Sequence, residues 1–128
     1  MTESQSFAMS TRLKHNLIIT LPDYIGSGTL SALQETALDS IQRSQTSAVI
    51  FDCSATKLID AIEFEELRKI AFMAEVLGAF SIFAGLRPST IKFLIDADVD
   101  VTGVRAFAGI DAALDYLETG APPRAPQF

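Results

Sequence analysis

The side chains most suited to nucleophilic or metal chemistry are few in this 128-residue chain. It contains one cysteine, Cys53, and one histidine, His15. A catalytic thiol needs a neighbouring base or positive charge, but Cys53 lies in the apolar run "SAVIFDC", far from His15 in sequence. We therefore favour Cys53 as a small buried hydrophobic residue over Cys53 as a nucleophile. A single residue of each type also excludes a metal cluster of His and Cys ligands.

Carboxylates and glycines are more numerous, but their spacing does not match a known kind of site. The segment "DADVD" (96–100) lacks the Gly and Glu positions of a calcium loop, and we favour a solvated loop. The segment "GSGTLSAL" (26–33) lacks the lysine and the spacing of a phosphate-binding loop. Nowhere does the chain supply a nucleophile, a base and an orienting group together. The sequence thus predicts a protein that is not an enzyme, with no cofactor and no metal.

The segment "KLIDAIEFEEL" (57–67) holds the most informative polar residues. Asp60 is a candidate N-cap for the helix that follows, yet that helix opens with the aliphatic residues Ala61 and Ile62. Glu63 places a negative charge in the first turn. We favour its interaction with the helix dipole over a second hypothesis, that the charge partly mimics a phosphate.

Alternating periodicities predict the elements that position this segment. β-branched and apolar runs favour strands, and apolar residues at helical spacing favour helices. Ser27 or Thr29 is expected to cap the first helix, Gly78 to end the second and Gly120 to end the last. The expected strands are 6–13 (a weaker candidate and hairpin partner of the next), 16–21, 47–53, 79–85 and 104–108, and the expected helices are 27–44, 61–77, 87–97 and 110–120.

This order predicts an α/β fold with a mixed, mostly parallel sheet of four or five strands and about four flanking helices. The near-continuous apolar runs at 47–53 and 79–85 suit central strands. We expect one domain over residues 6–119. Residues 1–5 form an expected N-terminal tail, and residues 120–128 form an expected flexible, Pro-rich C-terminal tail.

The helix over 61–77 has an unusual pattern on its outer side. Its predicted inner stripe consists of Phe64, Leu67, Ile70, Ala71, Ala74 and Leu77. The opposite side carries the charged residues Glu65, Glu66 and Lys69, of which Glu65 and Lys69 have the favourable i, i+4 spacing. Apolar residues interrupt this charged side, which suggests a partner surface, although sheet twist or a nearby loop could cover them. They are Ile62, Phe72, Met73 and Val76.

Composition restricts the possible partners and the compartment. The net charge is −6 and the pI is about 4.6, which argues against nucleic acid or an anionic membrane surface as the main partner. No apolar run reaches the roughly 18–20 residues of a membrane span, so we expect no membrane insertion, and we see no secretion signal. A lone cysteine permits no internal disulfide and suits a reducing cytoplasm, where we expect this protein.

The order and spacing of three segments resemble the STAS domain, the fold of anti-sigma factor antagonists. They are "VIFDCSATKLIDA", "LGAFSIFAGLRPST" and "GVRAFAGIDAALDYL", and the resemblance covers roughly residues 8–118. The segments "AGLRPSTI" (84–91) and "VTGVRAFAGIDAAL" (101–114) are most similar to the small single-domain scaffold proteins of the stressosome.

The resemblance implies a non-enzymatic regulatory protein. Such proteins bind a switch-protein serine/threonine kinase, an anti-sigma factor or other STAS proteins, in homo- or hetero-oligomers. They are controlled by phosphorylation of a Ser or Thr just after the residue that corresponds to Asp60. Here Ala61 and Ile62 carry no hydroxyl, so the loop–helix junction is expected to keep the docking surface and to lack the usual switch.

Other hydroxyls are candidates for phosphorylation. Related scaffold proteins can carry a second phosphorylated hydroxyl at the start of the first helix, where Ser27 and Thr29 lie, although we favour capping for both. Ser54 and Thr56 precede Asp60 and are taken as turn residues.

Two further functions remain as alternatives. The chain could be a STAS accessory subunit of a membrane transporter, of the ABC type for lipids or anions. A weaker alternative is a small-ligand or nucleotide binder with a shallow pocket at the sheet ends.

Overall fold

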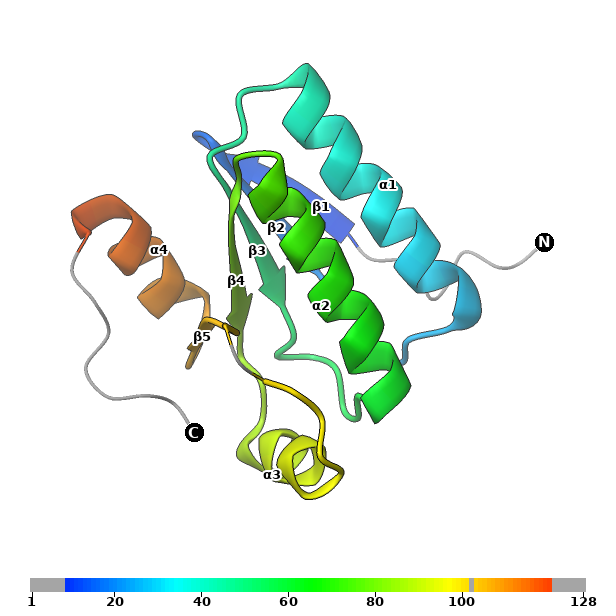
Figure 1. The fold of residues 1–128 in the computed structure, drawn as a ribbon. Helices are drawn as coiled ribbons and strands as arrows, with labels where there is room; N and C mark the ends of the chain where they lie inside the picture. The colour runs from blue at the N-terminus through cyan, green and yellow to red at the C-terminus, as the bar shows by residue number, and fades with distance from the viewer. Residues whose placement is uncertain (1–8, 102, 121–128) are drawn as a thin grey trace.

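The computed structural model describes residues 9–101 and 103–120, with the side chain of Ser27 left out. Over these residues the chain forms one five-stranded sheet with strands in the order β1-β2-β3-β4-β5 (Figure 1). The strands are β1 (Met9–Leu13), β2 (Asn16–Thr20), β3 (Ala48–Asp52), β4 (Phe80–Ala84) and β5 (Ala106–Phe107). β1 is antiparallel to β2, whereas all later pairs are parallel.

Helices connect the parallel strands, as a parallel pairing requires. They are α1 (Ser27–Arg43), α2 (Ala61–Val76), α3 (Pro88–Asp96) and, after β5, α4 (Ile110–Thr119). The predicted α/β class, with a mostly parallel sheet and four flanking helices, is confirmed. The predicted tail over 1–5 and all of the predicted tail over 120–128 except Gly120 lie outside the described residues, so the domain bounds stay predictions.

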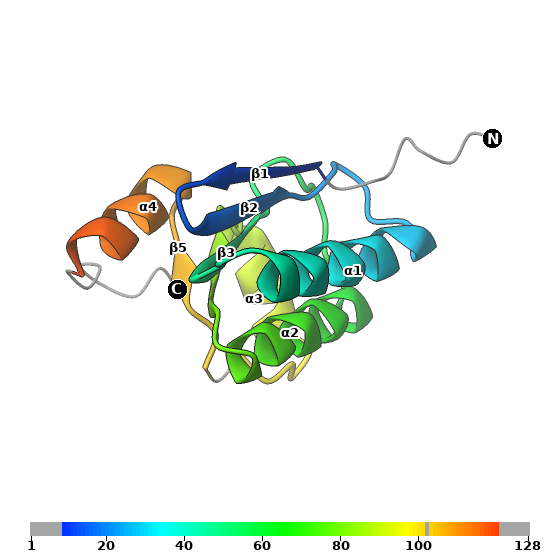
Figure 2. The same cartoon turned by 90° about the horizontal axis from the view of Figure 1, so that it is seen from above.

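The sheet separates two apolar layers, because successive side chains of a strand point to opposite faces. Figure 2 shows α1 and α2 on one side of the sheet and α4 on the other. On the first side Phe83 stacks on Phe51, with ring centroids 5.3 Å apart, and lies 5.7 Å from the ring of Phe64 on α2. The smaller second layer consists of Ile50, Ile82, Ala84, Phe107 and Ala113.

The inner stripe of α2 is largely as predicted. Phe64, Leu67, Ile70, Ala71 and Ala74 are buried. The inclusion of Leu77 was wrong, since this residue is 47% exposed. The helix ends at Val76, and Gly78 follows with a φ of 102°, a backbone conformation that favours glycine.

The start of α1 differs from the prediction. The N-cap residue is Gly26, so neither Ser27 nor Thr29 holds that position. Thr29 lies at the third helical position, and its Oγ1 accepts a hydrogen bond of 3.1 Å from the backbone N–H of Gly26. A hydroxyl thus does contribute to the helix end, but it does so by reaching back from within the first turn.

Candidate functional site: the loop–helix junction and the outer face of α2

Asp60 and Glu63 form the polar part of the junction. The backbone N–H of Glu63 donates to Asp60 Oδ1 at 2.7 Å, and the backbone N–H of Asp60 donates to Glu63 Oε1 at 3.0 Å. This reciprocal pair is a capping box, so the predicted cap at Asp60 is confirmed. Ala61 occupies the first helical position, and Ile62 follows it.

The loop between β3 and α2 is attached to the loop between β2 and α1. Thr56 Oγ1 donates to the carbonyl of Pro22 at 2.7 Å, and the backbone N–H of Lys57 donates to the carbonyl of Asp23 at 3.3 Å. Ile59 is buried just before Asp60. These contacts hold the start of α2 in a defined position at the carboxyl ends of β2 and β3.

Exposed apolar side chains surround the junction. Ile62 is 76% exposed, and Tyr24 and Leu58, from the two loops, are 69% and 63% exposed. Sequence reasoning missed Tyr24 and Leu58. The available signal was a large apolar residue within each polar loop that flanks a strand end, but one such residue alone does not show exposure.

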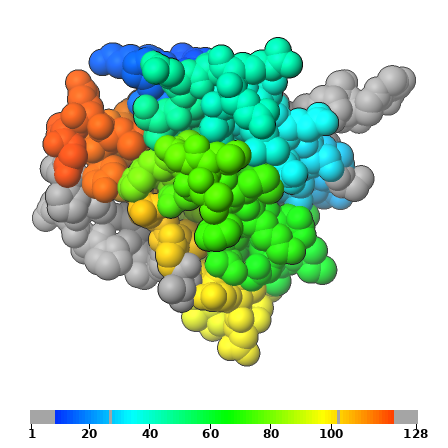
Figure 3. Space-filling model, turned by 45° about the horizontal axis from the view of Figure 1, so that its top comes forward, coloured from blue at the N-terminus to red at the C-terminus, as the bar shows by residue number. Residues whose placement is uncertain are grey.

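Further along the helix, the outer side of α2 carries two more exposed apolar residues and a partly exposed one. Phe72 is 71% and Val76 67% exposed, whereas Met73 is only partly exposed. Figure 3 shows α2 beside α1 on the face turned to the viewer. Three of the four apolar residues predicted on this side are therefore well exposed, and Met73 is exposed less.

The charged residues between them form other ion pairs than the predicted i, i+4 pair. Arg68 Nη2 lies 3.4 Å from Glu65 Oε1, and Lys69 Nζ lies 3.7 Å from Glu66 Oε2. The structure thus uses two i, i+3 pairs, and the i, i+4 pair of Glu65 with Lys69 is absent from its ion pairs. Such exposed pairs contribute little to stability, about 0–1 kcal/mol each.

The candidate phosphorylation sites differ in accessibility. The side chains of Thr29 and Thr56 are buried, and both hydroxyls make hydrogen bonds. Ser54 is exposed, and its Oγ donates to the carboxylate of Asp52. The side chain of Ser27 lies outside the described part of the chain. Among the described candidates, Ser54 is the hydroxyl that a kinase could reach without local opening.

Cys53 is buried, as predicted, in the layer between the sheet and α1 and α2. Burial raises the pKa of its thiol far above the ordinary range, and the charge of Asp52 raises that pKa further. The thiolate needed for nucleophilic chemistry is therefore strongly disfavoured. No group of three or more His, Cys, Asp or Glu residues in the described ranges could hold a metal ion.

None of the helices in residues 9–101 and 103–120 combines the length and the apolar character that crossing a bilayer requires.

No family model and no curated protein sequence matches this chain. Solved structures do match it. A chain of the stressosome, a signal integration and transduction hub, has a TM-score of 0.76 at 19% identity, with 90% of this chain and 100% of that chain covered. An RsbS variant of Moorella thermoacetica has a TM-score of 0.75 at 19% identity, covering 87% and 94%. The unphosphorylated anti-sigma factor antagonist SpoIIAA has a TM-score of 0.71 at 11% identity, covering 91% and 99%.

The likeness extends to part of a membrane transporter. The murine anion transporter Slc26a9 has a TM-score of 0.63 at 16% identity, covering 84% of this chain but only 18% of that chain. At these identities the likeness is one of fold. The five-stranded, mostly parallel sheet with four helices suits this likeness, and the chain has the STAS fold of the anti-sigma factor antagonists.

Proposed function

We propose that this chain is a non-enzymatic regulatory module that binds other proteins, in the manner of anti-sigma factor antagonists and stressosome scaffold proteins. The observation that carries the proposal is a series of exposed apolar side chains along α2, a helix whose start is fixed. Ile62, Phe72 and Val76 are exposed on α2, and the capping box of Asp60 and Glu63 fixes the end of that helix. Exposed apolar side chains grouped in this way are typical of a protein interface.

The partner is a switch-protein kinase, an anti-sigma factor or another STAS protein, in the cytoplasm. The charged residues between the apolar ones are Glu65, Glu66 and Lys69, and they supply orientation more than affinity. Met73 adds a partly exposed apolar side chain. The junction lacks a switch, because Ala61 stands at the first helical position without a hydroxyl. The carboxylate of Glu63 already accepts a backbone hydrogen bond, which supports a structural role for it over mimicry of a phosphate.

A second candidate is an accessory subunit of a membrane transporter. The likeness to part of Slc26a9 favours it, since that protein carries the same fold within an anion transporter. The two candidates differ in partner, and both would use an exposed surface of this domain.

Binding and folding must be measured on the same variants. Phe72→Ser with Val76→Ser should weaken binding to a switch-protein kinase or STAS protein encoded near this chain's gene, measured by calorimetry with purified proteins. Because both side chains are exposed, urea unfolding should change by no more than about 1 kcal/mol. The control is Phe93→Ser with Ile95→Ser on α3, a partly exposed apolar pair on another helix; it should leave binding unchanged.

Three results would count against the proposal. If the α2 variant loses stability while binding is unchanged, Phe72 and Val76 are packing residues. If the α3 control weakens binding equally, the effect is one of general surface hydrophobicity. If the wild-type protein binds neither kinase nor STAS protein but is captured with a transport ATPase, the transporter candidate takes precedence.

A further inference from the structure

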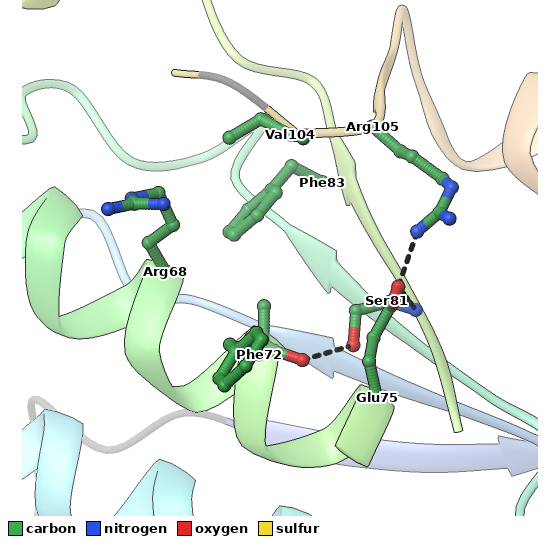
Figure 4. Close-up of a pocket in the computed structure, with 9 residues that line it drawn as sticks. Arg68, Phe72, Glu75, Ser81, Phe83, Val104 and Arg105 are labelled. Atoms are coloured by element: carbon green, nitrogen blue, oxygen red, sulfur yellow. Dashed lines mark hydrogen bonds and ion pairs between the residues drawn. The ribbon is translucent and has the colours of Figure 1, made fainter. Parts of the chain in front are cut away.

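A cavity of about 290 Å³ lies between α2 and the segment that leads into β5. Its lining combines apolar walls with charged groups. In the view of Figure 4, Phe83 lies between Arg68 on α2 and Arg105 before β5. The cavity is lined by Arg68, Ala71, Phe72, Glu75, Ser81, Phe83, Gly103, Val104 and Arg105.

The groups at one end of the cavity already satisfy one another. The carboxylate of Glu75 forms an ion pair with Arg105 and accepts a hydrogen bond of 3.0 Å from the backbone N–H of Ser81. Ser81 Oγ donates to the carbonyl of Ala71 at 3.0 Å, and the guanidinium of Arg105 lies 3.9 Å from the ring centroid of Phe80. The charges of Glu75 and Arg105 cancel, so this end has little to offer an ion.

Arg68 has unused hydrogen-bonding capacity. Its Nε is buried and has no hydrogen-bond partner among the described residues. On the same edge of the guanidinium, Nη2 makes only a long contact of 3.4 Å with Glu65 Oε1. The Nε and Nη2 edge of arginine is one that binds a carboxylate through two parallel hydrogen bonds, and a buried donor without an acceptor is costly.

We propose that this cavity binds a small organic monoanion, a carboxylate attached to a flat or branched apolar body. Glu75 and Arg105 neutralise each other, so once Arg68 releases Glu65 it supplies one positive charge, which suits a single carboxylate better than a doubly charged phosphate. Phe72, Phe83 and Val104 supply apolar contact for the rest of the ligand. The volume is close to the lower limit of known ligand pockets, about 300 Å³, and so restricts the ligand to a small molecule.

Binding requires a modest movement of one side chain. The Nε atom is not in contact with solvent, so the guanidinium of Arg68 must turn toward the cavity and release Glu65. The long contact with Glu65 makes this release inexpensive, and the arginine stem is flexible. Glu65 therefore competes with the ligand for the same edge of Arg68.

Benzoate is a suitable probe, with benzamide as its neutral counterpart of the same shape. We expect saturable changes in the amide NMR signals of Ser81, Val104 and Arg105 with benzoate, and at least about tenfold weaker binding of benzamide. Arg68→Gln should weaken benzoate binding about tenfold or more, and Glu65→Gln should strengthen it. Lys69→Gln is the matched control: it removes one positive charge from the same helix outside the cavity and should leave affinity nearly unchanged.

The outcomes distinguish a cavity that binds a carboxylate specifically from a cavity that is only a gap in side-chain packing. Equal binding of benzoate and benzamide to wild-type protein would overturn the proposal. This comparison needs no variant, so it remains decisive if Arg68→Gln fails to fold. Equal effects of Arg68→Gln and Lys69→Gln would also overturn it, since they would indicate general charge attraction. Absence of saturable shifts with benzoate would overturn it as well, since the cavity would then bind no such anion.

Discussion

Asp60 and Glu63 each accept a hydrogen bond from the backbone N–H of the other, at 2.7 and 3.0 Å. The pair satisfies one donor of the first helical turn and the donor of the cap residue itself, and both carboxylates lie where the helix dipole favours negative charge. The start of α2, which presents Ile62 to solvent, is therefore fixed by residues within four positions of one another.

Removal of the cap should destabilise the domain. We expect Asp60→Ala to lower the free energy of unfolding by about 1 kcal/mol, because the N–H of Glu63 loses its acceptor. Asp60→Asn keeps a side-chain oxygen and serves as the control, with a smaller loss. Urea unfolding of the three proteins measures this, and equal stability of Asp60→Ala and wild type would show that water replaces the cap at no cost.

Two glycines should respond to alanine in opposite directions. Gly85 has a φ of 79°, and an added Cβ would lie 2.8 Å from Ser54 Oγ and 3.0 Å from Ser54 Cα. Gly85→Ala should therefore destabilise the fold by about 1–3 kcal/mol. Gly28 lies in α1 with no atom near its added Cβ, so Gly28→Ala should stabilise by up to about 1 kcal/mol. Thermal unfolding of both variants tests the contrast, and a shift in the same direction for both would contradict it.

The buried thiol should make stability fall at alkaline pH. The pKa of Cys53 is raised in the folded state, so above its ordinary value of 9.0 the unfolded chain ionises while the folded chain does not. Deprotonation then favours the unfolded state, with a slope that approaches about 1.4 kcal/mol per pH unit. Cys53→Ala removes this contribution. Unfolding from pH 8 to 10 should show a steeper loss for wild type, whereas parallel curves would exclude a role of the thiol.

A hydroxyl at the first position of α2 should recreate a phosphoacceptor. We expect a switch-protein kinase encoded near this chain's gene to phosphorylate Ala61→Ser and not wild type. The helix N-terminus favours the phosphate, while Asp60 and Glu63 repel it, an effect reduced by solvent screening. The added charge of about −1.5 to −2 beside exposed Ile62 should then weaken partner binding.

Mass spectrometry locates the phosphate in that experiment. Both proteins are also prepared with Ser54→Ala, because Ser54 is the exposed hydroxyl of the preceding loop. Phosphate on wild-type Ser27, Thr29, Ser54 or Thr56 would show that the switch has another position. If neither protein is phosphorylated or bound by the kinase, the docking hypothesis loses its support.

The fold could be predicted because its signals are local. Apolar runs such as "SAVIFDC", helical spacing of Phe64 and Leu67, and the Asp60 cap each depend on a few neighbouring residues. Even so, the cap of α1 could not be placed, because Ser27, Thr29 and Gly26 are all acceptable near a helix start and the backbone path decides between them. Leu77 shows the same limit, since the helix ends at Val76 and the apolar spacing does not tell where it ends.

The surface of the site was predictable only in part. Exposure of Ile62, Phe72 and Val76 follows from the helical angle relative to the core stripe. The pairing of Arg68 with Glu65 depends on side-chain conformations that spacing does not determine. The cavity requires that Val104 and Arg105 return beside α2, as in the contact of Arg105 with Glu75, which lie 30 residues apart. Tyr24 and Leu58 likewise lie on two loops that hydrogen bonds between distant segments hold together.

Because of the strand order β1-β2-β3-β4-β5, the backbone amides of the sheet are protected unequally from hydrogen exchange. β3 and β4 have hydrogen-bonded neighbours on both sides and almost entirely buried side chains, whereas β1 is an exposed edge and β5 pairs through two residues. Backbone amides should therefore exchange with deuterium slowest in β3 and β4, where exchange requires global unfolding, and fastest at the edges, where local opening suffices. The junction at Asp60 and the cavity beside Ser81 both adjoin this slowest-exchanging pair, so a partner or ligand would meet a surface anchored to the most persistent part of the molecule.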